Sequence, residues 1–263
     1  MADHDWGKQL DKVAKSLPKI VEDVFNNALL SQQPVAIETV ARLRRLNPEY
    51  TPEQLIKKIN KIYISSATAS GAAAGIVAVV PNGVVQVPAA LADLAVFLES
   101  SVLYVLTLAE IYNVDAEDFE RRKFLVMTAL LGDAGAKQVV NALGKKTIPY
   151  WAKTIINKIP MHAIQAANKV LGSRFITKYG TKQGVLVLGK QIPFGLGAAV
   201  GAGSNAFFGY AVMKTTKKIL STPPADWEKN EHEKEKRTSF YHAQFIAYHR
   251  ITSCIISMSG TPM

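Results

Sequence analysis

The sequence predicts an all-α fold, a multi-helix bundle around two apolar helical segments rich in glycine and alanine. The first observation is a run without charged residues, 62–92, interrupted once by Pro81-Asn82-Gly83. A second uncharged run, 191–213, is dense in glycine. The third observation is that apolar residues in most other segments recur with the spacing of one helix face. We therefore expect the two uncharged runs to be central, with the other helices around them.

The first fifty residues predict two helices. Apolar positions in 1–31 have helical spacing, and Pro18 predicts a break because proline removes a backbone hydrogen bond. Pro34 predicts the start of a second helix, which ends in a basic stretch that suits the negative end of the helix dipole. A strong start signal follows, because Thr51 can cap a helix that has Pro52 at its first position and Gln54 three residues after the cap.

The first uncharged run predicts a helical hairpin. Gly71 and Gly75 are four residues apart, a spacing that lets two helices approach closely. Pro81-Asn82-Gly83 is typical of a turn, so the run forms two arms. Each arm has about fifteen apolar residues and a helical length of about 22 Å, which is short against a hydrocarbon core of about 30 Å. We expect the hairpin to dip into one leaflet or to be buried in protein.

Three acids interrupt the second arm, which we expect from about Pro88 to Tyr112: Asp93, Glu99 and Glu110. Glu99 and Glu110 are eleven residues apart and share a helix face. Two buried carboxylates on one face could perform general acid/base chemistry or hold a cation. Ion pairing with the basic half of the chain is the favoured interpretation, because an unpaired buried charge is costly. Asp93 is expected to pair or to form a polar seam.

Charge is divided unevenly along the 263 residues, whose net charge is +10. Between Arg121 and Lys218 there are sixteen Lys/Arg and one acid, Asp133, so this part carries +15 and the remainder −5. Such a partition indicates an anionic partner, lipid or nucleic acid, although solvated faces of amphipathic helices explain part of it. The residues that we expect to bind anionic lipid or a partner are Lys145, Lys146, Lys153, Lys158, Lys169, Arg174, Lys178, Lys182 and Lys190.

Asp115 is the expected cap of the helix that enters this basic part and stops at Gly132. Short helices follow, and Pro193 begins the second apolar element. In that element Gly197, Gly201, Asn205 and Gly209 are four residues apart and form a nearly smooth face. Glycine is a poor helix former, so this face must be held by close packing. The expected partner is the segment Gly71–Gly75.

The chain is expected to form one helical domain, 1–220, with N-terminal helices in 1–50 and the core in 51–220. Pro223-Pro224 indicates a linker, and a charge run, 228–237, precedes a mixed apolar end. We expect 221–263 to be a linker and a weakly ordered tail.

Motifs for nucleotides, metals and nucleophilic catalysis are not supported. Residues 184–190 have the spacing of a phosphate-binding loop, but Gln191 replaces the Ser/Thr that holds magnesium. The glycines of 195–201 suit helix packing better than dinucleotide binding. The single cysteine and five scattered histidines predict no metal site. The basic part has few aromatic residues, which disfavours nucleic acid. We predict no cofactor and no catalytic residue.

Several pieces in order over about 51–227 resemble the EcsC family. They include the Ala/Gly segment 68–75, the pieces Leu108-Ala-Glu-Ile-Tyr112 and Phe175-Ile-Thr-Lys-Tyr-Gly180, and the glycine block 192–205. The chain is most similar to uncharacterised actinobacterial members. The resemblance implies a bacterial protein without an established activity and, because the namesake is encoded beside an ABC transporter, a membrane-protein partner such as a transporter. The tail after Trp227 departs from the family.

The combined prediction is a membrane-associated helical accessory protein, recruited to anionic lipid by its basic half. It would lie at the cytoplasmic face of the membrane, peripheral or shallowly inserted, and would not be an enzyme. One alternative is a pore-forming or membrane-inserting protein that stores its apolar hairpin in a helical shell. Another is a hydrolase that uses the buried carboxylates.

Overall fold

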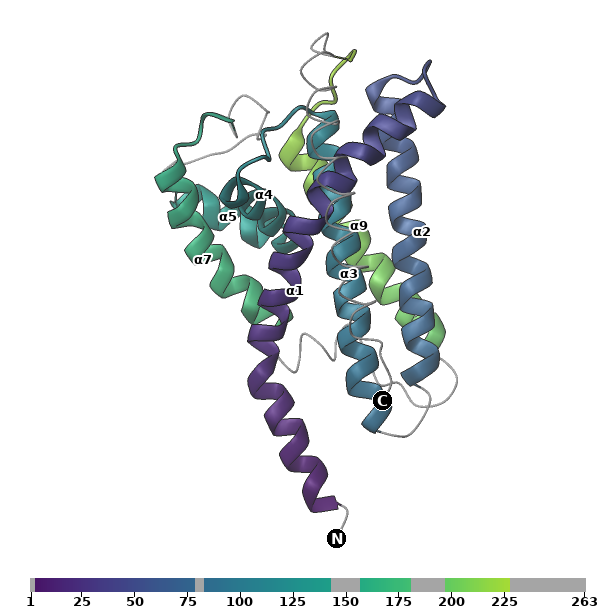
Figure 1. The fold of residues 1–263 in the computed structure, drawn as a ribbon, viewed down its shortest axis with the longest axis vertical. Coiled ribbons are helices and arrows are strands. Elements are labelled where there is room, and N and C mark those ends of the chain that lie inside the picture. The colour runs from purple at the N-terminus through teal and green to yellow at the C-terminus, as the bar shows by residue number, and fades with distance from the viewer. Residues whose placement is uncertain (1–2, 79–82, 143–156, 181–196, 228–263) are drawn as a thin grey trace, which may run out of the picture.

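A computed structural model of the chain describes residues 3–78, 83–142, 157–180 and 197–227 (Figure 1). The helices in these ranges are α1 (Asp3–Leu46), α2 (Pro52–Ala78), α3 (Gly83–Ile111), α4 (Phe119–Leu131), α5 (Asp133–Ala142), α7 (Met161–Tyr179) and α9 (Gly197–Leu220). No strand occurs in the described ranges, and the predicted all-α bundle is confirmed. The tail from 228 to 263 lies outside them.

The first helix, α1, continues through Pro18 and Pro34. The predicted break near Pro18 and the predicted helix start at Pro34 are therefore wrong. Proline removes one hydrogen bond from a helix, and Figure 1 shows α1 changing direction along its length. One buried apolar face nevertheless continues past both prolines, and it includes Leu17, Val21, Phe25, Ala28, Leu29, Ala36 and Val40. Its packing, mainly against α3, compensates for the lost hydrogen bonds.

The helices α2, α3 and α9 lie side by side (Figure 1). α2 and α3 are antiparallel, as the hairpin prediction requires, and α9 packs along α2 more extensively than any other two described helices pack. The start of α2 has the predicted reciprocal cap. The amide of Thr51 donates to Oε1 of Gln54 at 2.8 Å, and the amide of Gln54 donates to Oγ1 of Thr51 at 3.3 Å.

Two tyrosines join α2 to α3 in the core. Tyr63 and Tyr104 stack with their ring centroids 4.2 Å apart. The hydroxyls of Tyr63 and Ser101 are hydrogen bonded at 2.7 Å, and the hydroxyl of Tyr104 donates to Oδ1 of Asn60 at 2.7 Å. These hydrogen bonds fix the register of the two helices and offset the cost of removing the hydroxyls from water.

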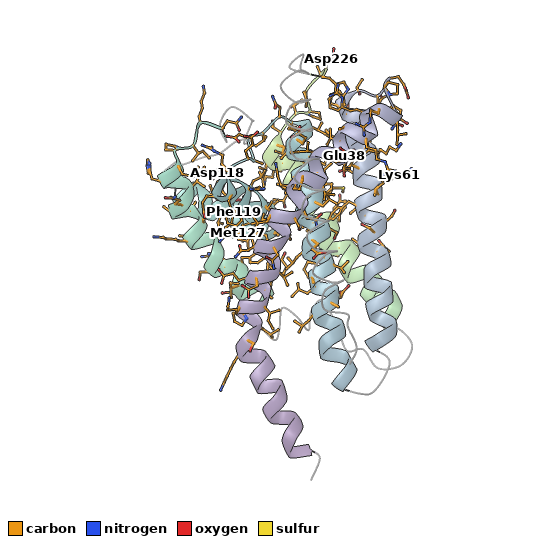
Figure 2. The ribbon with its side chains drawn as sticks, in the orientation of Figure 1. Glu38, Lys61, Asp118, Phe119, Met127 and Asp226 are labelled. Carbon is orange, nitrogen blue, oxygen red and sulfur yellow. The ribbon has the colours of Figure 1, made fainter. Side chains whose placement is uncertain are left out.

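A second group of helices, α4, α5 and α7, packs beside the first (Figure 1). The cap of α4 is Asp118, whose carboxylate accepts the amides of Glu120 at 2.9 Å and Arg121 at 3.1 Å. The prediction of Asp115 was wrong, because Asp118 is the residue with extended backbone directly before the first turn (Figure 2). The predicted stop at Gly132 is confirmed, and this residue has a φ of +70°.

The segment after α9 returns to the start of the bundle. Nε1 of Trp227 donates to the carbonyl of Tyr50 at 2.9 Å, and the guanidinium carbon of Arg44 lies 4.3 Å from the centroid of the indole ring. The hydroxyl of Tyr112 also donates to the carbonyl of Ser221 at 3.3 Å. Residues 221–227, predicted as part of a linker, are therefore anchored to α1, to the residue that follows α3 and to the α1–α2 connection.

Within the described part of the chain, one helical stretch is long and apolar enough to cross a membrane. It is Leu91–Ile111 of α3, with a mean hydropathy of 1.8. Two thirds of its most apolar stretch (67%) is buried inside the molecule. The core helix of a water-soluble protein has the same properties, so this stretch is weak support for membrane insertion.

Candidate functional site

Three parts of the fold meet at a half-open cleft of about 540 Å³. The junction of α4 and α5 forms one side, the last turn of α7 forms another, and α9 contributes residues between Phe207 and Lys218. The chain turns between α4 and α5 at Gly132, whose combination of φ +70° and ψ −147° is readily adopted only by glycine. This turn places the end of α4 and the start of α5 on the same cleft.

Apolar side chains form most of the cleft surface. Leu130, Leu131 and Val212 are buried beneath it. Two aromatic residues of α9 extend into solvent beside it, since Phe207 is 69% exposed and Tyr210 is 56% exposed. The neighbouring Phe208 turns inward and lies edge-on to Phe97 of α3, with centroids 6.3 Å apart. The exposed aromatic face of α9 is therefore distinct from the face that packs in the bundle.

Three lysines and one acid stand at the cleft. Nζ of Lys218 lies 2.8 Å from Oδ1 of Asp133, at the first residue of α5. The hydrogen bond from Lys218, and then its charge, hold the pKa of Asp133 below its usual value, and Lys214 and Lys137 lower it further. Asp133 thus offsets one lysine, and the charges of Lys178 and Lys214 leave the cleft with a net charge of about +2.

Lys178 has an unusual environment at the end of α7. Its ammonium donates to the carbonyl of Leu130 at 2.7 Å, and the hydroxyl of Tyr179 donates to the same oxygen at 2.9 Å. This carbonyl belongs to the last turn of α4, where no helical amide can satisfy it. Burial of the ammonium lowers the pKa of Lys178. Among the described residues no carboxylate forms an ion pair with it.

The basic residues predicted to bind lipid fall into two groups. Lys158, Lys169, Arg174 and Lys178 are exposed. Lys169 and Arg174 extend from α7, a helix without any acidic residue, into solvent, whereas the ammonium of Lys178 turns to the end of α4. Val170, 41% exposed, adds an apolar side chain to the exposed surface of α7. The others lie outside the described residues: Lys145, Lys146, Lys153, Lys182 and Lys190.

The predicted packing glycines lie on the two helices that form the most extensive pair. Gly71 and Gly75 are in α2, whereas Gly197, Gly201, Asn205 and Gly209 are in α9. At Gly209 the approach is close, because a Cβ there would lie 3.1 Å from Cβ of Ala67 and 3.7 Å from the ring of Tyr63. Gly209 therefore packs against α2 one turn before Gly71.

The three acids of α3 differ in burial. Asp93 is 6% exposed, Glu110 is half-buried and Glu99 is exposed. The prediction that Glu99 is buried is wrong, because it lies on the solvent stripe of α3 that also carries Ala92 and Val96. A pair of buried carboxylates at positions 99 and 110 is therefore not formed.

The sequence interpretation missed the exposed aromatic residues of α9. For this helix the sequence analysis predicted only the glycine face, and it predicted no exposed face with Phe207 and Tyr210. The spacing of Phe207, Tyr210, Lys214 and Lys217 places them on one helix face that ends in positive charge. That pattern was a usable signal for an exposed amphipathic face.

No group of three or more His, Cys, Asp or Glu suited to a metal ion occurs in the part of the chain that the structure describes. The cleft therefore presents lysines, a paired carboxylate, aromatic rings and aliphatic side chains as its chemistry. Comparison of the chain with protein families, with characterised proteins and with solved structures finds no match.

Proposed function

We propose that the protein is an accessory protein that docks peripherally on anionic membrane surfaces through α7 and the exposed face of α9. The support from α7 is electrostatic. Lys169 and Arg174 extend from it into solvent, and no acid in the helix opposes them. A basic residue near an anionic bilayer contributes about 1 kcal/mol, so these two and Lys214 would together favour binding by about 3 kcal/mol.

The observation that carries the proposal is the exposure of Phe207 and Tyr210 beside the lysines of the cleft. Aromatic rings settle at the level of the lipid headgroups, where their apolar body and the surrounding cations are both favoured. A purely solvated basic face would not need them. The EcsC resemblance adds a membrane protein, such as a transporter, as a further proposed partner at the cytoplasmic face of a bacterial membrane.

The test is sedimentation with vesicles of phosphatidylcholine alone and with about 30% phosphatidylserine. We expect binding only to the second kind, weakened by salt. Lys169→Gln with Arg174→Gln should reduce the partition coefficient by about 30-fold. The matched control is Lys57→Gln with Lys61→Gln, two exposed lysines of α2; Figure 2 shows Lys61 on the side away from α7. An equal loss of vesicle binding in both double variants would contradict the proposal. So would wild-type binding that shows no preference for phosphatidylserine.

A second candidate is insertion of the α2–α3 hairpin into the bilayer. The length and hydropathy of Leu91–Ile111 favour it, and its burial inside the bundle opposes it. Release of a dye trapped in phosphatidylserine vesicles distinguishes the two candidates. Peripheral docking predicts binding without release, whereas an inserted hairpin predicts release that accompanies binding.

A further inference from the structure

The cleft between α7 and α9 has properties that a flat docking surface does not need. It has a volume of about 540 Å³, in the range of pockets that enclose small ligands. Leu130 and Val212 form an apolar floor, and Phe207 and Tyr210 stand beside it as large apolar surfaces in contact with water. An apolar chain that lies on this floor and against the two rings would remove the exposed surface of Phe207 and Tyr210 from water, which is favourable.

The charges at the same cleft are unbalanced. Asp133 offsets Lys218, and the net charge of about +2 from Lys178 and Lys214 has no counterpart among the described lining residues. A phosphate monoester carries about −1.5 to −2 charges at neutral pH, so it complements this excess, whereas a carboxylate supplies one charge. An anion beside Lys178 would also compensate the desolvation that lowers the pKa of its ammonium.

We propose that this cleft binds one single-chain lipid with a phosphate monoester headgroup, the acyl chain on the Leu130–Val212 floor and the phosphate between Lys178 and Lys214. The proposal deepens the membrane-docking function and rests on it for the source of the lipid. It differs in requiring one lipid molecule to bind within the cleft. Phe207 and Tyr210 cover the chain where the cleft opens to solvent.

The test is calorimetric titration of the full chain with oleoyl lysophosphatidic acid below its critical micelle concentration. We expect one site per chain. Oleoyl lysophosphatidylcholine, which has the same chain but no net charge, should bind at least about tenfold more weakly, and so should inorganic phosphate. Equal binding of both lipids, phosphate binding as tight as that of the lysophosphatidic acid, or no binding at all would overturn the proposal.

Two variants test the assigned residues. Lys178→Gln with Lys214→Gln should weaken lysophosphatidic acid binding at least about tenfold. The fold should persist, because Tyr179 still donates to the carbonyl of Leu130. The matched control is Lys57→Gln with Lys61→Gln, two exposed lysines of α2 that do not line the cleft. Circular dichroism checks that each variant is folded, and wild-type affinity in the double variant would refute the assignment.

A cleft-filling variant separates this proposal from the docking function. Ala211 is exposed and lines the cleft, so Ala211→Trp fills the space and leaves every charge in place. We expect it to lose lysophosphatidic acid binding while it still sediments with phosphatidylserine vesicles. Unchanged binding of lysophosphatidic acid to this variant would overturn the cleft site alone. A wild-type protein that fails to sediment with the vesicles would overturn the docking function.

Discussion

Tyr63, Tyr104 and Tyr179 place their phenol groups in the core, where Tyr63 and Tyr104 share the α2–α3 seam and Tyr179 binds the end of α4. Burial raises the pKa of each phenol above its ordinary value of about 10. Burial, and then the charge of Glu53, raise the pKa of Tyr112 to about 12. These residues therefore hold their protons more tightly in the folded protein than in the unfolded chain.

We predict that the protein unfolds in alkali. Because the folded pKa values are raised, their contribution to stability is complete below about pH 10. The part from Tyr112 is lost as the pH rises through about 12, and the other three tyrosines lose theirs at higher pH. Phenolate absorbance should appear together with loss of helical circular dichroism. Tyr210→Phe removes an exposed phenol and should leave the transition in place. Full ionisation near pH 10 with the helices intact would be inconsistent with this prediction.

At the residue scale, the cap at the start of α2 was predictable, whereas the cap of α4 and the burial of single residues were not. The Thr51–Gln54 cap follows from side-chain chemistry within one turn, and it is present. The burial of Glu99 depends on which face of α3 meets its neighbours. Because apolar residues surround the α3 axis, periodicity does not distinguish the core face from the solvent face. The missed exposure of Phe207 has the same cause.

Among the elements, the α2–α9 pair depends on a small residue at its contact. Gly209→Leu should lower the free energy of unfolding by about 1–3 kcal/mol, because its Cβ alone would approach Ala67 to 3.1 Å. Gly172→Leu in α7 is the matched control. A Cβ there meets nothing within 4 Å, so the gain in helix propensity should stabilise it by up to about 1 kcal/mol. Urea denaturation measures both; equal effects would argue against close packing at Gly209.

The order of the helices was largely predictable, and the length of α1 was not. Gly/Ala composition indicated that two distant segments would pack, and their helices form the most extensive pair. Pro18 and Pro34 carry a strong local signal for a helix end. Tertiary packing overrides it, because the buried face that includes Phe25 and Ala36 is continuous against α3. Sequence periodicity within one segment does not contain that information.

For the whole molecule, the contact of Trp227 with Arg44 and Tyr50 joins the end of the described chain to the last turn of α1 and the connection between α1 and α2. Trp227→Ala should destabilise the protein by about 2 kcal/mol, since it removes a hydrogen bond and the stacking of a cation on the ring. Trp227→Phe keeps a ring and should recover about half of that loss. Thermal unfolding measures both. A melting temperature unchanged by either substitution would show that this contact contributes nothing.

The partition of charge was visible in the sequence at the scale of the molecule, but its spatial form was not. The excess of positive charge between Arg121 and Lys218 extends over α4, α5, α7 and α9. Only the fold brings Lys178 and Lys214, thirty-six residues apart in the chain, to one cleft beside exposed aromatic residues. Such a meeting depends on how α7 and α9 both pack against α4, which no local pattern specifies.

The turn at Gly132 has an evolutionary consequence. Its φ of +70° and ψ of −147° lie in a region that side chains with a Cβ essentially do not occupy. Lysines and aromatic residues around the cleft can be exchanged for others of similar chemistry, but the backbone at this position accepts no such exchange. In diverging descendants of this chain, glycine at position 132 should therefore persist after the surrounding side chains have changed.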